Sequence, residues 1–188
     1  MTLQIAQDEA ADEVLSTNAF ALLTGMLLDQ QFPMERAFAG PAKILDRFGT
    51  LDPSAIAEAP PEEFADICGT PPVVHRFPAA MADRIQKLAR HIVDNYGGDA
   101  AKLWQGADSG VDLLKRISAL PGFGKQKSQI FVALLGKQLS VRPPGWEAAA
   151  GVYAEEDSFR SVADVRDQPS LAKVRAFKQS QKAAAKPG

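Results

Sequence analysis

The sequence has 188 residues, a formal net charge of −2 and ordinary fractions of hydrophobic and charged residues, as expected for a globular chain of one domain or two small lobes. No apolar stretch reaches membrane-spanning length, and the first residues lack the basic-then-apolar order of a secretory signal, so we expect a cytoplasmic protein without membrane contact. The single cysteine, Cys68, excludes an internal disulfide and is too few for a zinc site or an iron–sulfur cluster. We expect it in the core.

The apolar residues recur with a helical period throughout, and no window shows the alternation of a half-buried strand, so the sequence predicts an all-α fold. Residues 14–28 are apolar nearly all round, which predicts one buried central helix. A second helix is expected over 34–48, with an interruption at Gly40-Pro41. Further helices are expected to start at Pro53 and at Pro61, because proline suits the first helical position.

Residues 81–96 carry an apolar stripe that Gly97-Gly98 should end. Asp108-Ser109-Gly110 can cap a short helix, and another is expected over about 124–135. Ser161 and Asp164 have the spacing of a capping box, which should open the first of two C-terminal helices.

The charges are unevenly distributed along the chain. Residues 113–146 contain no acid and six basic side chains, namely Lys115, Arg116, Lys125, Lys127, Lys137 and Arg142. Residues 169–188 also lack acids and carry Lys173, Arg175, Lys178, Lys182 and Lys186. One surface is therefore expected to be cationic despite the net negative charge.

The most informative segment runs from Leu120 to Ser128, with the sequence Leu-Pro-Gly-Phe-Gly-Lys-Gln-Lys-Ser. A Pro-Gly-x-Gly turn between two short helices forms a hairpin in which glycines permit positive φ and close backbone approach. The second helix starts at the turn, so its unpaired N–H groups and its dipole favour an anion there, and Lys125 and Lys127 add positive charge. The segment predicts a grip on nucleic-acid phosphates without sequence selectivity. The alternative is a hairpin that merely needs glycine to turn.

With this hairpin, the sequence resembles the helix-hairpin-helix DNA glycosylases, which include endonuclease III and the adenine and alkylpurine glycosylases. The segment Leu27-Leu28-Asp29-Gln30-Gln31 is similar to the family segment whose glutamine fills the gap left by an extruded base. The resemblance covers about residues 12–140. For Gln30 and Gln31 the alternative is a polar helix end.

The resemblance implies base excision in double-stranded DNA with a flipped damaged base, and hairpin contacts through Leu120, Gly122, Phe123, Gly124, Lys125 and Lys127. It also allows a monovalent cation on the hairpin carbonyls of Leu120 and Gly122. No iron–sulfur cluster or other cofactor is expected. A DNA-acting protein in a bacterium would be associated with the nucleoid.

Two departures bear on catalysis. The position of the family's lysine nucleophile holds Gln126, so strand-cutting lyase chemistry is not expected. The segment 138–145, where the family has its catalytic aspartate, contains no acid. Glycosidic cleavage needs a group that stabilises positive charge on the sugar, and the candidates are Asp29 and Glu147. The alternatives for Asp29 are solvation at the helix end or pairing with Arg36, and the alternative for Glu147 is a solvated position in the first turn of the next helix.

Three further residues are candidates for the base pocket. The segment 70–78 combines prolines with His75, Arg76 and Phe77, so that Phe77 can stack on a base and His75 can donate a hydrogen bond. Trp146 can stack in the same way. The alternatives are a proline-stiffened connection, and a tryptophan that pins the C-terminal lobe to the rest.

The sequence as a whole predicts two helical lobes with DNA in a cleft, one of residues 12–138 with the hairpin at about 110–136, and one of residues 1–11 with 139–188. The expected function is that of a monomeric, monofunctional DNA glycosylase. A non-catalytic binder of damaged or distorted DNA is the main alternative, and a helical interaction protein with an incidental hairpin is the third.

Overall fold

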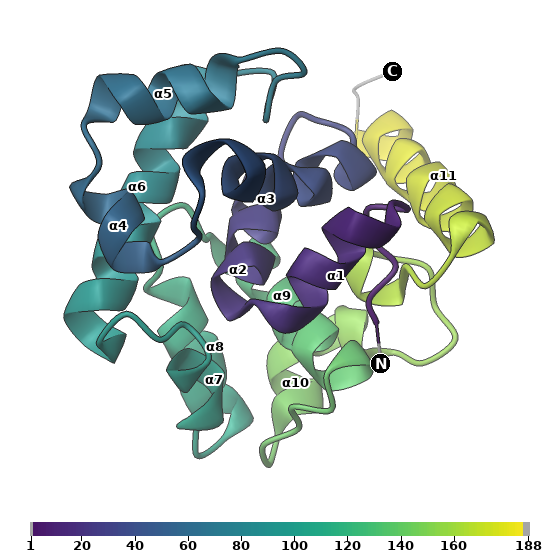
Figure 1. Cartoon of the computed structure of the whole chain (residues 1–188). Helices are drawn as coiled ribbons and strands as arrows, with labels where there is room; N and C mark the ends of the chain where they lie inside the picture. Colours follow the sequence, from purple (N-terminus) through teal and green to yellow (C-terminus); the bar gives the residue numbers. More distant parts are fainter. Residues whose placement is uncertain (1, 186–188) are drawn as a thin grey trace. The chain divides into compact units, whose positions relative to one another are not determined.

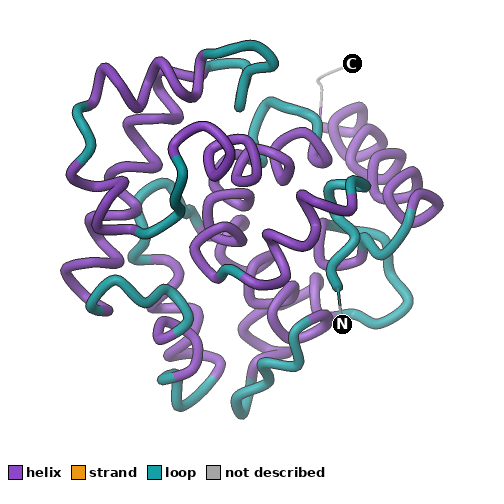
Figure 2. The backbone as a smooth tube through the Cα atoms, viewed as in Figure 1, coloured by secondary structure: helices purple, strands orange, loops and turns teal. Residues whose placement is uncertain are grey.

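The computed structural model describes residues 2–185, and all regular structure in that range is helical, as predicted. Figure 2 shows helices joined by short loops. The α-helices are α1 (Glu9–Thr17), α2 (Ala19–Leu28), α3 (Met34–Phe48), α4 (Pro53–Glu58), α5 (Pro61–Gly69), α6 (Pro78–Tyr96), α7 (Lys102–Gln105), α8 (Gly110–Ser118), α9 (Lys125–Gln138), α10 (Trp146–Ala150) and α11 (Gln168–Ala185). Two 3₁₀ turns, η1 (Gly151–Ala154) and η2 (Val162–Asp164), lie between α10 and α11. No helix in the described range is long and apolar enough to cross a membrane.

The chain forms two compact units whose boundaries differ from the predicted lobes. Unit 1 comprises residues 1–106 and 119–123, and unit 2 comprises 107–118 and 124–188. The first residues belong to unit 1 because the backbone N–H groups of Ile5 and Ala6 donate to the carboxylate of Asp12, at 2.9 and 2.8 Å. Both helices of the hairpin belong to unit 2, whereas the turn between them belongs to unit 1.

The predicted helix over 14–28 is two helices, so that prediction was wrong at one point. Asn18 has an extended backbone, and its side chain accepts the N–H of Ala21, which makes it the N-cap of α2. The apolar run continues across the break, because Leu15 of α1 and Phe20 of α2 are both buried. From Phe20 to Leu28 every residue of α2 is buried, as expected of a central helix.

The interruption expected at Gly40-Pro41 is absent from α3, which runs unbroken from Met34 to Phe48. A proline inside a helix removes one hydrogen bond and costs about 3 kcal/mol. Gly40 and Pro41 are nevertheless buried, and a Cβ on Gly40 would come within 2.6 Å of Leu28 Cδ1 of α2. Close packing of α3 on α2 offsets the local cost.

The predicted starts of α4 and α5 are confirmed, with Pro53 and Pro61 in the first turn of each helix. Both helices pack along α6 (Figure 1). The buried stripe of α6 includes Met81, Ile85, Leu88 and Ile92. Gly97 ends α6 in the left-handed conformation that the sequence predicted. Cys68 of α5 is fully buried, and burial raises the pKa of its thiol to about 12, which fits a core residue.

In unit 2, α9 packs against α8, α10 and η2. The capping box predicted at Ser161 and Asp164 is present, but it opens the 3₁₀ turn η2 rather than an α-helix, and one C-terminal helix, α11, follows in place of two. Lys173, Arg175, Lys178 and Lys182 lie on α11. Lys186 lies outside the described residues.

Candidate nucleic-acid interface

The turn of the hairpin is built on the main chain of Leu120 to Phe123. The Phe123 N–H donates to the Leu120 carbonyl at 3.1 Å, and Gly122 has a φ of +85°, as the third residue of a type II turn with proline second requires. The side chains of Leu120 and Phe123 are buried and anchor the turn, whereas Gly122 is exposed. Backbone groups, rather than these two side chains, are therefore what the turn can present to a ligand.

Helix α9 begins directly after the turn. Its N-cap is Gly124, which has no side chain to cap the first N–H groups of the helix. Of the two turn glycines, Gly122 adopts the positive φ that glycine permits, whereas Gly124 has a φ of −83°. A Cβ on Gly124 would have no described atom within 4 Å, and Lys125 beside it is exposed. Amide hydrogens, the positive end of the helix dipole and lysine charge thus meet at an open surface, an arrangement suited to an anion.

The turn also packs on the end of α2, which carries the second family segment. A Cβ on Gly122 would lie 2.5 Å from Leu27 Cδ1. The tight contact places the hairpin turn beside the helix that leads into Gln30 and Gln31, and all of these residues belong to unit 1. The sequence separated the two motifs by some ninety positions, and the fold brings them together.

The two candidate glutamines differ in their environment. The Gln30 side chain is held at both ends, because its Nε2 donates to the Leu27 carbonyl at 2.8 Å and its Oε1 accepts from Arg84 Nη1 at 3.1 Å. Gln31 is exposed, and its φ of +53° is a left-handed conformation that few residues other than glycine adopt. Of the pair, Gln31 is the side chain that faces solvent.

His75 is buried rather than facing a pocket. Its Nδ1 accepts the Phe77 backbone N–H at 3.0 Å, so the ring proton is on Nε2, which donates to the Gln30 carbonyl at 2.8 Å. The ring is fully buried and packs on Phe32, with centroids 4.8 Å apart. Both ring nitrogens thus form hydrogen bonds within unit 1. The N–H group that the sequence suggested for a base contact instead joins the segment of His75 to the loop of Gln30.

Phe77 remains accessible, in contrast to His75. The side chain is 44% exposed, with the Arg76 guanidinium 5.3 Å from the ring centroid. Three backbone carbonyls near the start of this segment, those of Ile67, Thr70 and Pro72, accept hydrogen bonds from Arg47. An aromatic ring beside a cation on a braced segment is suited to stacking on a base.

The two candidate acids lie in different units. Asp29 is the C-cap of α2, half-buried and adjacent to Gln30 in unit 1. Glu147 is exposed in the first turn of α10 in unit 2, where a carboxylate is favoured by the helix dipole.

Trp146 lies in the interior of unit 2. It is 8% exposed, and its ring covers Gly136 of α9 so closely that a Cβ there would overlap it. Arg142 donates to the Gly136 carbonyl at 2.8 Å and lies over the indole, 5.4 Å from its centroid. Trp146 therefore fastens α10 to α9 within unit 2.

Sequence reasoning missed Tyr153. Gln126, at the position of the family's lysine, donates from Nε2 to the Tyr153 hydroxyl at 3.0 Å. The two residues are 27 positions apart, and nothing in the local pattern around η1 pointed to this pairing.

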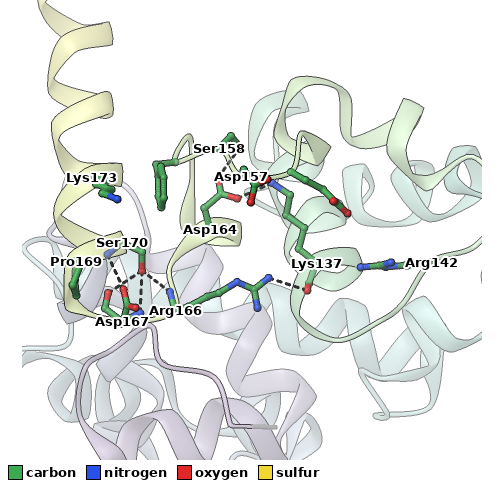
Figure 3. Close-up of a pocket in the computed structure, with 12 residues that line it drawn as sticks. Lys137, Arg142, Asp157, Ser158, Asp164, Arg166, Asp167, Pro169, Ser170 and Lys173 are labelled. Atoms are coloured by element: carbon green, nitrogen blue, oxygen red, sulfur yellow. Dashed lines mark hydrogen bonds and ion pairs between the residues drawn. The ribbon is translucent and has the colours of Figure 1, made fainter.

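A cavity of about 440 Å³ in unit 2 has charged walls of both signs (Figure 3). Its Asp164 is paired with Lys137 at 2.6 Å, and both side chains are buried. Hydrogen bonds from the side chain and backbone of Ser170 lower the pKa of Asp167. These two carboxylates hold the chain around α11 together, and we assign them no part in catalysis.

The fold and the hairpin define a class: an all-helical protein in which a glycine turn leads into an open helix N-terminus suited to phosphate. Residues 24–185 match the family model described as HhH-GPD superfamily base excision DNA repair protein. The chain belongs to this superfamily, as the sequence predicted, and it is a DNA repair protein that acts on DNA. A comparison with curated proteins found no match.

Proposed function

We propose that the protein is a monofunctional DNA glycosylase, which hydrolyses the bond between a flipped damaged base and its sugar without cutting the strand. The observation that supports this most directly is the uncapped start of α9 after the exposed Gly122, because it suits a DNA phosphate. Gln126 at the lysine position supports the absence of lyase activity, because an amide cannot form the imine that strand cutting requires.

Asp29 is the acid that we favour over Glu147. Asp29 is half-buried and lies in the same unit as the hairpin turn, Gln31 and Phe77, whereas Glu147 is exposed at a helix start. In the proposed step, the Asp29 carboxylate takes a proton from water as the water oxygen bonds to C1′ of the sugar. The bond from C1′ to the base breaks, and the base keeps the electron pair and is protonated by solvent.

A monovalent cation at the hairpin is part of the same proposal. The Leu120 carbonyl accepts one hydrogen bond, from Phe123, and a carbonyl oxygen has a second lone pair available for a cation. Gly122 is exposed, so that its carbonyl can contribute without displacing a side chain. DNA binding that is tighter in potassium than in an equal ionic strength of tetramethylammonium would support this part, and equal binding would contradict it.

The test is the release of free base from duplexes that carry uracil, hypoxanthine, alkylated or oxidised bases. We expect release from at least one of them, without strand cleavage. Asp29→Asn should lower the rate by about 100-fold or more, as for loss of a general base. Glu147→Gln and the control Asp83→Asn, an exposed ion-paired acid on α6, should leave the rate unchanged.

A second function, binding of damaged DNA without catalysis, is favoured by the absence of any acid in the segment 138–145. In that case no lesion in the panel releases a base, while a duplex with an abasic-site analogue is bound more tightly than an intact duplex. If the protein neither releases a base nor binds any of the duplexes, both proposals are contradicted.

A further inference from the structure

The loop after α2 is locked by contacts that come from distant parts of unit 1. The Gln30 backbone carbonyl accepts from His75, and the Gln30 side chain binds Arg84 and the carbonyl of Leu27. Gln30 is thus fixed through both its main chain and its side chain. The next residue is Gln31, exposed and left-handed.

The left-handed conformation of Gln31 has an energetic cost. A non-glycine residue with positive φ is destabilised by roughly 1–2 kcal/mol, so it persists only where the neighbouring contacts determine it. Fixing the Gln30 carbonyl fixes the orientation of the peptide unit between Gln30 and Gln31. The hydrogen bond from His75 therefore acts on the peptide that sets the direction of the Gln31 side chain.

His75 is itself held from two sides, which makes it a rigid donor. The backbone N–H of Phe77 fixes the tautomer through Nδ1, and the centroid of the His75 ring is 4.8 Å from that of Phe32 and 6.0 Å from that of Phe77. Because His75 is fully buried, its ring cannot turn out to solvent, and its hydrogen bond to Gln30 stays in one geometry. The same ring thereby couples the loop of Gln31 to the segment of the exposed Phe77.

We propose that His75 is a positioning residue, which holds Gln31 in a left-handed conformation so that its side chain enters the gap left by an extruded nucleotide. This inference rests on the proposed binding of flipped-base DNA. It assigns the gap-filling role to Gln31 alone, with Gln30 as the anchor. Preorganisation of this kind saves the ordering cost that a mobile loop would incur on binding.

The test compares the affinity of the full chain for a duplex with a tetrahydrofuran abasic analogue and for the intact duplex, as the ratio of the two. Gln31→Ala should lower this ratio about tenfold, which is the loss of one favourable contact of 1.4 kcal/mol. His75→Leu removes the donor and should lower the ratio by a similar factor. Binding of the intact duplex, which depends on the hairpin, should change little in either variant.

Two further variants separate positioning from a general structural role. His75→Gln keeps an N–H donor at a similar reach and should restore at least part of the ratio. In the double variant His75→Leu with Gln31→Ala, the ratio should equal that of Gln31→Ala alone, because His75 acts only through Gln31. Gln30→Ala, in which the backbone carbonyl remains, should have a smaller effect than Gln31→Ala.

The results can fail in distinguishable ways. No binding of either duplex would overturn the proposed function itself. Binding of both duplexes with a ratio unaffected by Gln31→Ala would overturn the gap-filling assignment. Additive losses in the double variant, or a ratio that His75→Gln leaves as low as His75→Leu, would overturn the positioning role. If the His75→Leu protein does not fold, His75→Gln is the variant that tests the positioning role. Its ratio of affinities for the abasic and intact duplexes must then stay near that of the unchanged protein.

Discussion

The two helices of the hairpin begin in opposite ways. At the start of α8, the Ser109 hydroxyl accepts the Asp112 N–H at 3.0 Å, and the Asp112 carboxylate accepts the Asp108 N–H at 3.2 Å. The Gly110 N–H donates to the Pro144 carbonyl at 2.8 Å. At the start of α9 stand an exposed glycine and Lys125, with no side-chain cap in the described range.

The difference lies in how the first N–H groups of each helix are treated. Each helix leaves its first N–H groups without intrahelical acceptors. The chain satisfies two of those of α8 itself, because the Pro144 carbonyl accepts the Gly110 N–H and the Ser109 hydroxyl accepts the Asp112 N–H, and it places an acid in the first turn. For α9 it supplies lysine instead, which is unfavourable beside a helix N-terminus unless an anion binds there. The α9 start is consequently the more suited of the two to DNA phosphate.

The largest expected effect is on stability, and it comes from replacing the glycine at the start of α8 by alanine, in comparison with the same replacement at the start of α9. In Gly110→Ala the new Cβ would overlap the backbone of Gly145 and Trp146, which cannot yield as a side chain can, so we expect a loss of stability of about 3 kcal/mol or more. Gly124→Ala meets no described atom and has an allowed φ, so its thermal unfolding should match the unchanged protein within the error. Equal destabilisation by both would break the comparison.

Charge reversal at α9 should have the next largest effect, on binding rather than on folding. Lys125→Glu with Lys127→Glu should weaken binding to all duplex sequences alike, by about 100-fold, and reduce the slope of log affinity against log salt by roughly 2. Fluorescence anisotropy over a salt series measures both. The control, Lys87→Glu with Lys102→Glu, makes the same change in net charge at exposed lysines of α6 and α7, outside the segment 120–128, and should keep the original slope.

Removal of the α8 cap should have a moderate effect confined to stability. Ser109→Ala leaves the Asp112 N–H without its hydroxyl acceptor, so the free energy of unfolding should fall by about 1 kcal/mol in urea titration. DNA affinity measured well below the unfolding midpoint should not change. A loss of affinity without a loss of stability would show that α8 also contacts DNA.

The smallest effect is a pH dependence from Asp112. The backbone hydrogen bond from Asp108, together with Arg116, holds the pKa of this carboxyl below its ordinary value. A group with a lowered pKa in the folded state contributes stability above its unfolded pKa of about 3.9, and that contribution is lost as the pH falls through the folded pKa. Asp112→Asn should therefore lose less stability on acidification than the unchanged protein. Identical acid titrations would contradict this account.

How much the sequence revealed depended on the distance between interacting residues. Pro121 and Gly122 define a turn by themselves, and the helix starts at Pro53 and Pro61 are equally local, so both were predictable. The break at Asn18 was overlooked because the apolar run continues across it, although asparagine is a favoured N-cap. The continuous α3 depends on packing of Gly40 on Leu28, which no local pattern around Pro41 reveals.

The same reasoning explains which site residues were misjudged. His75 lies 45 positions from Gln30, so the sequence could not predict the hydrogen bond between them. Because His75 stands in a basic, aromatic segment, the sequence favoured a contact with a base instead. Tyr153 was missed for the same reason, because its partner Gln126 lies 27 positions away in the sequence. Gln31 and Gln30 were indistinguishable in sequence, and only their backbone and partners separate them.

The assignment of residues 119–123 to unit 1, while the helices on either side belong to unit 2, has a consequence for dissecting the protein. The polypeptide passes from one unit to the other three times, so no single cut yields two intact halves. A fragment that stops at Gly106 would lack Gly122, which packs on Leu27. A fragment that begins at Ala107 would contain residues 119–123 without the part of unit 1 on which they pack. Expressed pieces of this chain should therefore be less soluble and less ordered than the whole, and function has to be mapped by substitution instead of truncation.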